Sequence, residues 1–173
     1  DVPDFPEAIR RALRQDPDVI LLGEMRDLET ISSAITAVET GHLVFGTLHT
    51  TGSSRTVDRM IVAFPAHQQE QIRAQLSVSI VAVISQVLMA RKGSKGRVAA
   101  FEVMLMNPAI GNLIRKNETH KIQSTIQTSR RLGMITLDDH LLELVQKGAI
   151  SREEALDHSQ EPKDLEMRLG ASS

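Results

Sequence analysis

Two histidines stand at the ends of a short apolar run, in the stretch GHLVFGTLHTT at residues 41–51. Imidazole nitrogens can bind a metal ion, occupy a polar position in a core, or sense a charged ligand through a hydrogen bond. If residues 43–48 form a strand, side chains alternate between its faces, and His42 and His49 are seven positions apart. The two imidazoles would then point to opposite faces, which argues against a shared metal site.

An acidic residue follows a second apolar run, in DPDVILLGEMRD at residues 16–27. Four apolar residues and then a carboxylate form the Walker B pattern, in which a rigid sheet holds a hard oxygen ligand for nucleotide-bound Mg²⁺. Glu24 is that carboxylate, and Gly23 would let the backbone approach a ligand. The pattern by itself also describes an ordinary carboxylate at a strand-to-turn junction.

His49 is followed by Thr50 and Thr51. If the two apolar runs are parallel strands, His49 lies at the same sheet edge as Glu24, where open α/β sheets bind ligands. These hydrogen-bonding groups are then a candidate phosphate-sensing cluster. The alternative is a histidine that ends the strand and donates to a nearby carbonyl group.

Arg26 lies two residues beyond Glu24. Its guanidinium group could bind phosphate or an acidic partner. A surface ion pair with Asp27 or Glu29 is the alternative interpretation.

The segments around these residues predict a strand–helix–strand unit. Residues 19–22 are a continuous apolar run, which is typical of a strand buried on both faces. Asp27 can cap a helix that ends at Gly41, and residues 43–48 form the second strand. Short joints between such elements favour a right-handed parallel crossover.

The rest of the chain is predicted to be mainly helical. An apolar stripe with helical spacing from His67 to Ala90 predicts one long helix, and alternation over residues 97–106 predicts a strand. We expect an α/β part over residues 1–106 and an all-helical part over 107–173. The other predicted helices lie between Asp4 and Asp16, from Arg55 to Ile61, at 108–116, at 118–127, after the cap Thr136, and after the cap Ser151.

The composition excludes several classes of protein. A net charge of -2 gives no basic field for nucleic acid, and the absence of cysteine excludes disulfides and thiolate zinc sites. No apolar run approaches the roughly 20 residues that cross a bilayer. The first residues are acidic and contain proline, unlike a secretory signal peptide.

The segment LRQDPDVILLGEMRDLETISSAITAVETGHLVFGTLHTT, residues 13–51, resembles the ATPases of type II and type IV secretion systems. It is most similar to the type IV pilus retraction (twitching-motility, PilT-like) ATPases. Their Walker B segment DPDxIxxGExRD places Glu24 in the acidic position, and their histidine box TGHLVFGTLHT places His42 and His49. Later segments that follow the family pattern are DRMIVAFP, ISQVLMARKGSKGRVAAFEVM, NPAIGNLIR and IQTSRRLGMITLDDHLLELVQKGAIS.

The resemblance implies a RecA-like P-loop NTPase core with a helical C-terminal subdomain, acting as a hexameric ATP-hydrolysing motor. Glu24 would position Mg²⁺, directly or through water, and His49 would report the γ-phosphate of ATP to the subunit interface. His42 would be structural or interfacial. The other residues implied for nucleotide binding or for the histidine box are Gly23, Arg26, Thr50 and Thr47.

The C-terminal part carries a further family motif, AIRNLIRE, in the form AIGNLIRK at residues 109–116. Gly111 replaces an arginine and Lys116 replaces an acid. We therefore expect a charged surface patch linked to retraction to be altered. The matching positions are Ala109, Ile110, Asn112, Leu113, Ile114 and Arg115.

No G-x-x-x-x-G-K-[ST] loop occurs in the 173 residues, although such a loop holds the phosphates in P-loop NTPases. In the family this loop precedes the segments that match here. The chain also begins with Asp rather than Met. We therefore expect the C-terminal portion of an ATPase, with a truncated core that is inactive alone.

The partners implied by the resemblance are further copies in a homo-hexamer, an inner-membrane pilus platform protein and, as a further candidate, a second retraction ATPase. The location would be the bacterial cytoplasm at the pilus base, with peripheral membrane contact and no direct binding of nucleic acid. One alternative is a pilus-assembly or type II secretion ATPase, but those relatives typically carry a four-cysteine zinc module. Another is a nucleotide-incompetent ring or platform interaction module.

Overall fold

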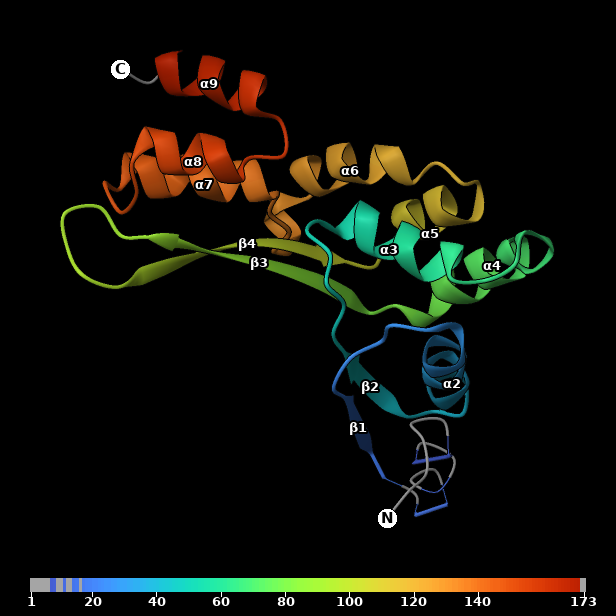
Figure 1. Cartoon of the computed structure of the whole chain (residues 1–173). Helices are drawn as coiled ribbons and strands as arrows, with labels where there is room; N and C mark the ends of the chain where they lie inside the picture. The colour runs from blue at the N-terminus through green and yellow to red at the C-terminus, as the bar shows by residue number, and fades with distance from the viewer. Residues whose placement is uncertain (1–6, 9–10, 12–13, 16, 172–173) are drawn as a thin grey trace. The chain divides into compact units, whose positions relative to one another are not determined.

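The computed structural model describes residues 7, 8, 11, 14, 15 and 17–171 (Figure 1). The helix predicted between Asp4 and Asp16 lies largely outside these residues. The chain forms two compact units. Unit 1 comprises residues 1–50, 56–81 and 108–119, and unit 2 comprises residues 51–55, 82–107 and 120–173.

Unit 1 contains the predicted strand–helix–strand unit: β1 (Val19–Leu22), α2 (Leu28–Glu39) and β2 (Leu43–Gly46). The two strands are parallel, so the prediction is confirmed. Asp27 caps α2, because its Oδ1 accepts a hydrogen bond of 2.8 Å from the backbone N–H of Thr30. The apolar faces of helix and sheet meet in a small core of Ile20, Leu22, Ala34 and Ala37, with Met25 and Val44 packed against it.

The apolar run of β1 is buried on one face within the described part of the chain. Ile20 and Leu22 are buried, whereas Val19 and Leu21 are exposed. The prediction of a strand buried on both faces is therefore wrong for this structure. The reason is that α2 packs against one side of the two-stranded sheet and supplies apolar contacts there only.

The remaining helices of unit 1 are short. After α3 (Ser53–Val62), whose first three residues belong to unit 2, come the 3-10 turn η1 (Ala66–Gln68) and α4 (Gln69–Ser79). Helix α4 packs against α5 (Pro108–Arg115).

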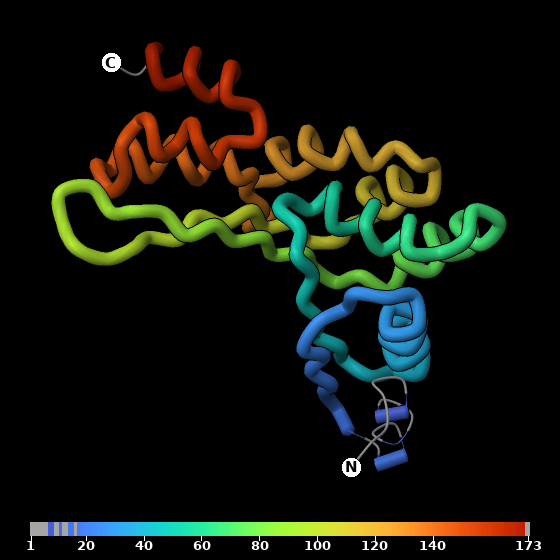
Figure 2. The backbone as a smooth tube through the Cα atoms, viewed as in Figure 1, coloured from blue at the N-terminus to red at the C-terminus, as the bar shows by residue number. Residues whose placement is uncertain are grey.

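The long helix predicted from His67 to Ala90 is wrong in its second half. Helix α4 ends at Ser79, and residues 82–90 form strand β3, which pairs antiparallel with β4 (Arg97–Leu105) along its whole length. Figure 2 follows the backbone through this hairpin. Apolar residues four positions apart lie on one face of a helix and also on one face of a strand, so the stripe fitted both structures. The β-branched residues of the segment favour the strand.

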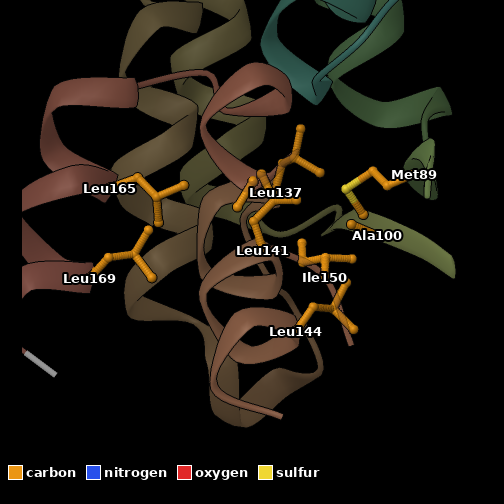
Figure 3. Packing of buried hydrophobic residues seen from close by; sticks show 9 residues of the cluster. Met89, Ala100, Leu137, Leu141, Leu144, Ile150, Leu165 and Leu169 are labelled. Carbon is orange, nitrogen blue, oxygen red and sulfur yellow. The ribbon is translucent and has the colours of Figure 1, made fainter. Parts of the chain in front are cut away.

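Unit 2 is built on one face of this hairpin. Its helices are α6 (Ile122–Thr128), α7 (Leu137–Gln146), α8 (Arg152–His158) and α9 (Pro162–Ala171), with the 3-10 turn η3 (Arg130–Leu132). The 3-10 turn η2 (Thr119–Lys121) begins at a residue of unit 1 and continues into unit 2. Figure 3 shows its main core, to which both strands and the last three helices contribute. The buried members are Met89, Ala100, Leu137, Leu141, Leu144, Ile150, Ala155, Leu165 and Leu169.

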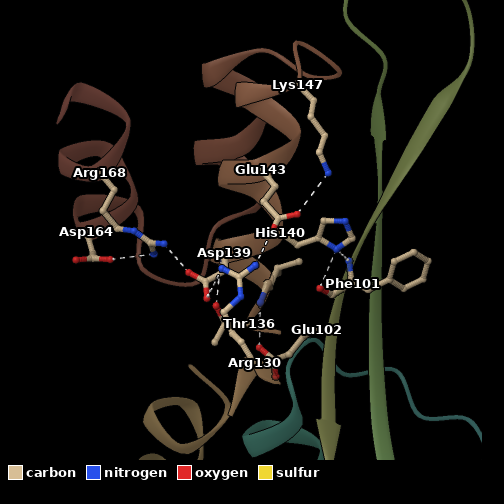
Figure 4. A network of polar contacts seen from close by, with 11 residues as sticks. Phe101, Glu102, Arg130, Thr136, Asp139, His140, Glu143, Lys147, Asp164 and Arg168 are labelled. Atoms are coloured by element: carbon tan, nitrogen blue, oxygen red, sulfur yellow. Dashed lines mark hydrogen bonds and ion pairs between the residues drawn. The ribbon is translucent and has the colours of Figure 1, made fainter. Parts of the chain in front are cut away.

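Side-chain caps fix the beginnings of two helices of unit 2, and Figure 4 shows Thr136 and Asp139 at the start of α7. Thr136 caps α7 by accepting from the N–H of Asp139 at 3.1 Å, and Ser151 caps α8 by accepting from the N–H of Glu154 at 3.1 Å. Both caps were predicted and are confirmed. The helix predicted after Ser151 ends at His158, and it is followed by a further helix that was not predicted. This further helix begins at Pro162, because the proline ring suits a first helical turn.

The α/β class with a following helical part is confirmed. The division of the chain at residue 106 remains a prediction. The two compact units have other boundaries, because each consists of several segments that interleave along the sequence. Among the described residues, no helix is both long enough and apolar enough to span a membrane.

Candidate functional site

The edge of the two-stranded sheet in unit 1 brings the Walker B segment and the histidine box together. Strands β1 and β2 are parallel with Leu22 opposite Gly46, so both chains leave the sheet at one edge. The Thr47 hydroxyl donates to the carbonyl of Gly23, and the N–H of Met25 donates to the carbonyl of Thr47 at 2.9 Å. These bonds hold the two exit segments side by side.

Glu24 and His49 meet at this edge. His49 Nε2 lies 3.0 Å from Glu24 Oε1, and the Arg26 guanidinium contacts the same oxygen. The Glu24 side chain is 25% exposed, whereas that of His49 is 84% exposed. The site is therefore an acid half-covered by two basic side chains that face solvent.

The charge state of this acid follows from its neighbours. The hydrogen bond from Arg26 lowers the pKa of Glu24 below its ordinary value, and the charges of Arg26 and His49 act in the same direction against partial burial. The same contact raises the pKa of Arg26. Glu24 is consequently ionised at neutral pH, as a magnesium ligand must be.

The structure gives Arg26 and His49 other partners than the alternative interpretations of the sequence did. The acid that pairs with Arg26 is Glu24, instead of Asp27 or Glu29. The described partner of the His49 ring is a carboxylate, instead of a carbonyl group.

Gly46 and Met25 contribute packing that the sequence did not reveal. A Cβ atom at Gly46 would lie 2.7 Å from Met25 Cε, so the Met25 side chain in its present position crosses the end of β2 where glycine leaves room for it. The signal available in the sequence was a lone glycine inside an apolar strand, which often marks a close approach.

The other histidine-box residues have partners away from Glu24. Thr50 Oγ1 lies 2.7 Å from the hydroxyl of Thr56 on α3. His42 Nδ1 lies 3.0 Å from the carbonyl oxygen of Ala37, at the C-terminal end of α2. Within the described ranges, no three His, Asp or Glu side chains form a group that could hold a metal ion.

The C-terminal motif lies on α5. Ile110, Gly111 and Ile114 are buried, Leu113 is half-buried, and the remaining members Ala109, Asn112, Arg115 and Lys116 are exposed. Arg115 Nη1 donates to Ser77 Oγ on α4 at 3.0 Å. The backbone of Gly111 is buried whereas Lys116 is exposed, and the expected change in a surface patch stays a prediction.

A buried acid in unit 2 was missed as a functional candidate. Glu102 lies on β4 and is fully buried, and the backbone N–H of Ser53 donates to its Oε1 at 2.6 Å. The available signal was a carboxylate that alternates with Ala100 and Met104 on the inward face of a strand.

The comparisons with known proteins agree on one family. The profile of the type II/IV secretion system protein family matches residues 2–157. The type IV pilus retraction ATPase PilT of Pseudomonas aeruginosa is 54% identical over 165 residues, which are 95% of this chain and 48% of that protein. A twitching motility protein of Neisseria gonorrhoeae is 52% identical over 161 residues, covering 93% of this chain and 43% of that protein.

A solved structure supports the fold. The crystal structure of a pilus retraction motor PilT with bound ADP superposes with a TM-score of 0.88 at 46% identity, over 96% of this chain and 47% of that one. The chain therefore spans about half the length of the relatives that it matches.

Proposed function

The chain belongs to the type II/IV secretion system protein family, and we propose that it supplies the Walker B and histidine-box half of an ATP-hydrolysing motor for type IV pilus retraction. The observation that carries this proposal is the 3.0 Å approach of His49 to Glu24 at the sheet edge. Two residues 25 positions apart meet there because two parallel strands end together.

Glu24 fits a magnesium ion bound to nucleotide phosphates. Within the described part of the chain, both of its contacts use Oε1, so Oε2 remains for the ion or for one of its water ligands. Mg²⁺ commonly keeps several waters and takes only one or two protein carboxylates, with phosphates completing its shell. When bound, the ion would neutralise charge that develops on the phosphates during transfer.

His49 and Arg26 are placed to respond to a phosphate. Both side chains are mostly exposed, and each touches the oxygen of Glu24. A γ-phosphate near Glu24 would offer them a second anionic acceptor. His49 then senses whether the phosphate is present, and Gly23 adds an unobstructed backbone. The Thr50 hydroxyl would contribute by exchanging its partner Thr56 for the phosphate.

The present sequence contains no G-x-x-x-x-G-K-[ST], and we propose that another part of the motor supplies the phosphate-binding loop. We infer that the working form is a cytoplasmic homo-hexameric ring, in which ATP binds between subunits. Its proposed partners are the inner-membrane pilus platform protein and a second retraction ATPase. The absence of cysteine favours retraction over assembly or type II secretion, whose ATPases typically carry a four-cysteine zinc module.

The test is ATP turnover of the full-length protein that contains this chain. Glu24→Gln and His49→Ala should each lower kcat about 100-fold, because each removes a group aimed at the reacting phosphate. His120→Ala, which removes an exposed imidazole on η2, is the matched control and should turn over ATP normally. Normal turnover in both site variants, with the fold intact, would contradict the assignment.

A further inference from the structure

The chain leaves unit 1 directly after the site. Thr50 belongs to unit 1, and residues 51–55, here called the crossing segment, belong to unit 2. Gly52 is only the third residue after His49. Three residues span about 10 Å at most. Whatever holds the crossing segment therefore limits where His49 can lie.

Two adjacent backbone amides of the crossing segment are held by the β3–β4 hairpin. The N–H of Gly52 donates to Ser85 Oγ at 2.9 Å, and the N–H of Ser53 donates to Glu102 Oε1 at 2.6 Å. Ser85 and Glu102 are directly opposite each other in the antiparallel pair, and both are buried. A cross-strand pair of acceptors thus binds two successive amides.

The backbone of Gly52 has a conformation and a close neighbour that both favour glycine at this position. Its φ is +95°, a conformation that side-chain-bearing residues rarely adopt. A Cβ atom there would lie 2.7 Å from Gln160 Nε2. The same Gln160 nitrogen donates to Glu102 Oε2 at 3.3 Å, so the amide group covers Gly52 while bonded to the carboxylate that holds Ser53.

Glu102 connects the crossing segment to the helices of unit 2. Besides Ser53, its donors in the described part of the chain are Gln123 Nε2 on α6 at 3.1 Å, the N–H of Leu137 at 3.4 Å, and Gln160. Ser53 and Leu137 are the first residues of α3 and α7. Negative charge is favoured at helix N-termini, which allows a buried carboxylate that has no cationic partner among the described residues.

We propose that Glu102, with Ser85, is a positioning residue for His49, through which the helices of unit 2 are mechanically coupled to the phosphate-sensing histidine. This inference rests on the proposed function. Movement of the hairpin carries Gly52 and Ser53 with it, and the short tether transmits the movement to His49. In a motor, such an attachment lets the state of the C-terminal helices regulate hydrolysis.

The test is a double-mutant cycle on ATP turnover by the full-length protein. Glu102→Gln should lower kcat about 10- to 100-fold, because small displacements of an active-site group have effects of this size. The KM for ATP should change little, because Glu102 touches no nucleotide-binding residue of the proposal. In the His49→Ala background, Glu102→Gln should lower kcat no further, since both changes remove one function.

A purely structural role for Glu102 predicts a different pattern. Loss of fold would reduce the active fraction equally in both backgrounds, so the two effects would multiply. That outcome would overturn the inference, as would normal kcat in a folded Glu102→Gln protein. Glu166→Gln, which changes an exposed acid on α9 in the same unit, is the matched control and should leave kcat unchanged.

Ser85→Ala provides an independent variant if Glu102→Gln does not fold. It removes the acceptor for Gly52 without altering a buried charge, and it should also lower kcat in the wild-type background only. If His49→Ala itself has normal turnover, the proposed function fails and the inference fails with it. If His49→Ala is impaired but the effects multiply, the inference alone fails.

Discussion

Two glutamates show how differently the two units use the same side chain. Glu24 in unit 1 lies at a sheet edge, partly exposed, with Arg26 and His49 on one of its oxygens. Glu102 in unit 2 is fully buried and, among the residues that the structure describes, accepts from four neutral donors, two of them backbone amides that begin helices.

The difference shows which of the two glutamates can exchange its partners for a ligand and which is fixed in the structure. The partners of Glu24 are long, exposed side chains that can turn to another anion at little cost, which suits ligand binding. The partners of Glu102 are fixed by backbone and interior packing, so exchanging them would leave buried donors unpaired. Glu24 is therefore expected to matter for activity and Glu102 for both stability and the position of the crossing segment.

The largest expected effect follows from deleting each carboxylate. Glu102→Ala should lower the free energy of unfolding of the 173-residue chain by about 3 kcal/mol, because four donors lose their buried acceptor. Glu24→Ala should leave it close to the wild-type value, as is typical of exposed ion pairs. Urea unfolding followed by circular dichroism is the suitable measurement, since the chain has no Trp or Tyr. Equal losses of unfolding free energy in the two variants would contradict the proposed difference between Glu24 and Glu102.

A smaller effect is expected at another buried acid of unit 2. Asp138 accepts from the N–H groups of Gln160 and Glu161 and from the Ser159 hydroxyl, just before α9 begins. Asp138→Ala should cost about 1–2 kcal/mol, the usual effect of losing a helix cap. The same urea assay with Asp157→Ala, an exposed acid on α8, serves as control and should stay within about 0.5 kcal/mol of wild type. An unchanged free energy of unfolding in Asp138→Ala would show that this buried acid does not stabilise unit 2.

The smallest effect is a pKa change at the exposed site. Arg26→Met should raise the pKa of Glu24 toward its ordinary value, because the hydrogen bond from Arg26 is the main cause of its depression. A depressed pKa means that this contact stabilises the fold above the unfolded pKa, and that the contribution disappears as the pH falls through the folded pKa. Carboxyl NMR titration of the 173-residue chain measures the shift. An unchanged pKa of Glu24 in Arg26→Met would show that Arg26 does not interact with Glu24.

Much of unit 1 was predictable because its signals are local. Asp27 as a cap, the parallel strands and the shared edge of Glu24 and His49 all follow from short patterns. The hairpin was missed because spacing by four residues fits helix and strand alike. Whether a strand face stays uncovered, as at Leu21, depends on tertiary packing that no short pattern encodes.

The environment of Glu102 was not predictable from the sequence for a related reason. Its donors lie 21 to 58 positions away along the chain, on a loop and on several helices. The alternation along β4 indicates that Glu102 faces inward but does not predict which residues donate to it. Gly111 is similar, because only the structure shows that the backbone of this residue in a charged motif is buried.

The central claim is that Glu24 holds the divalent ion of a bound nucleotide. Electron paramagnetic resonance of Mn²⁺, used in place of Mg²⁺, measures this directly in the full-length protein with ATP. We predict that Glu24→Gln weakens Mn²⁺ binding to the ATP complex about 10- to 100-fold, the range seen when groups around a metal are lost. Equal Mn²⁺ affinity in wild-type and Glu24→Gln proteins, with ATP bound in both, would contradict the account.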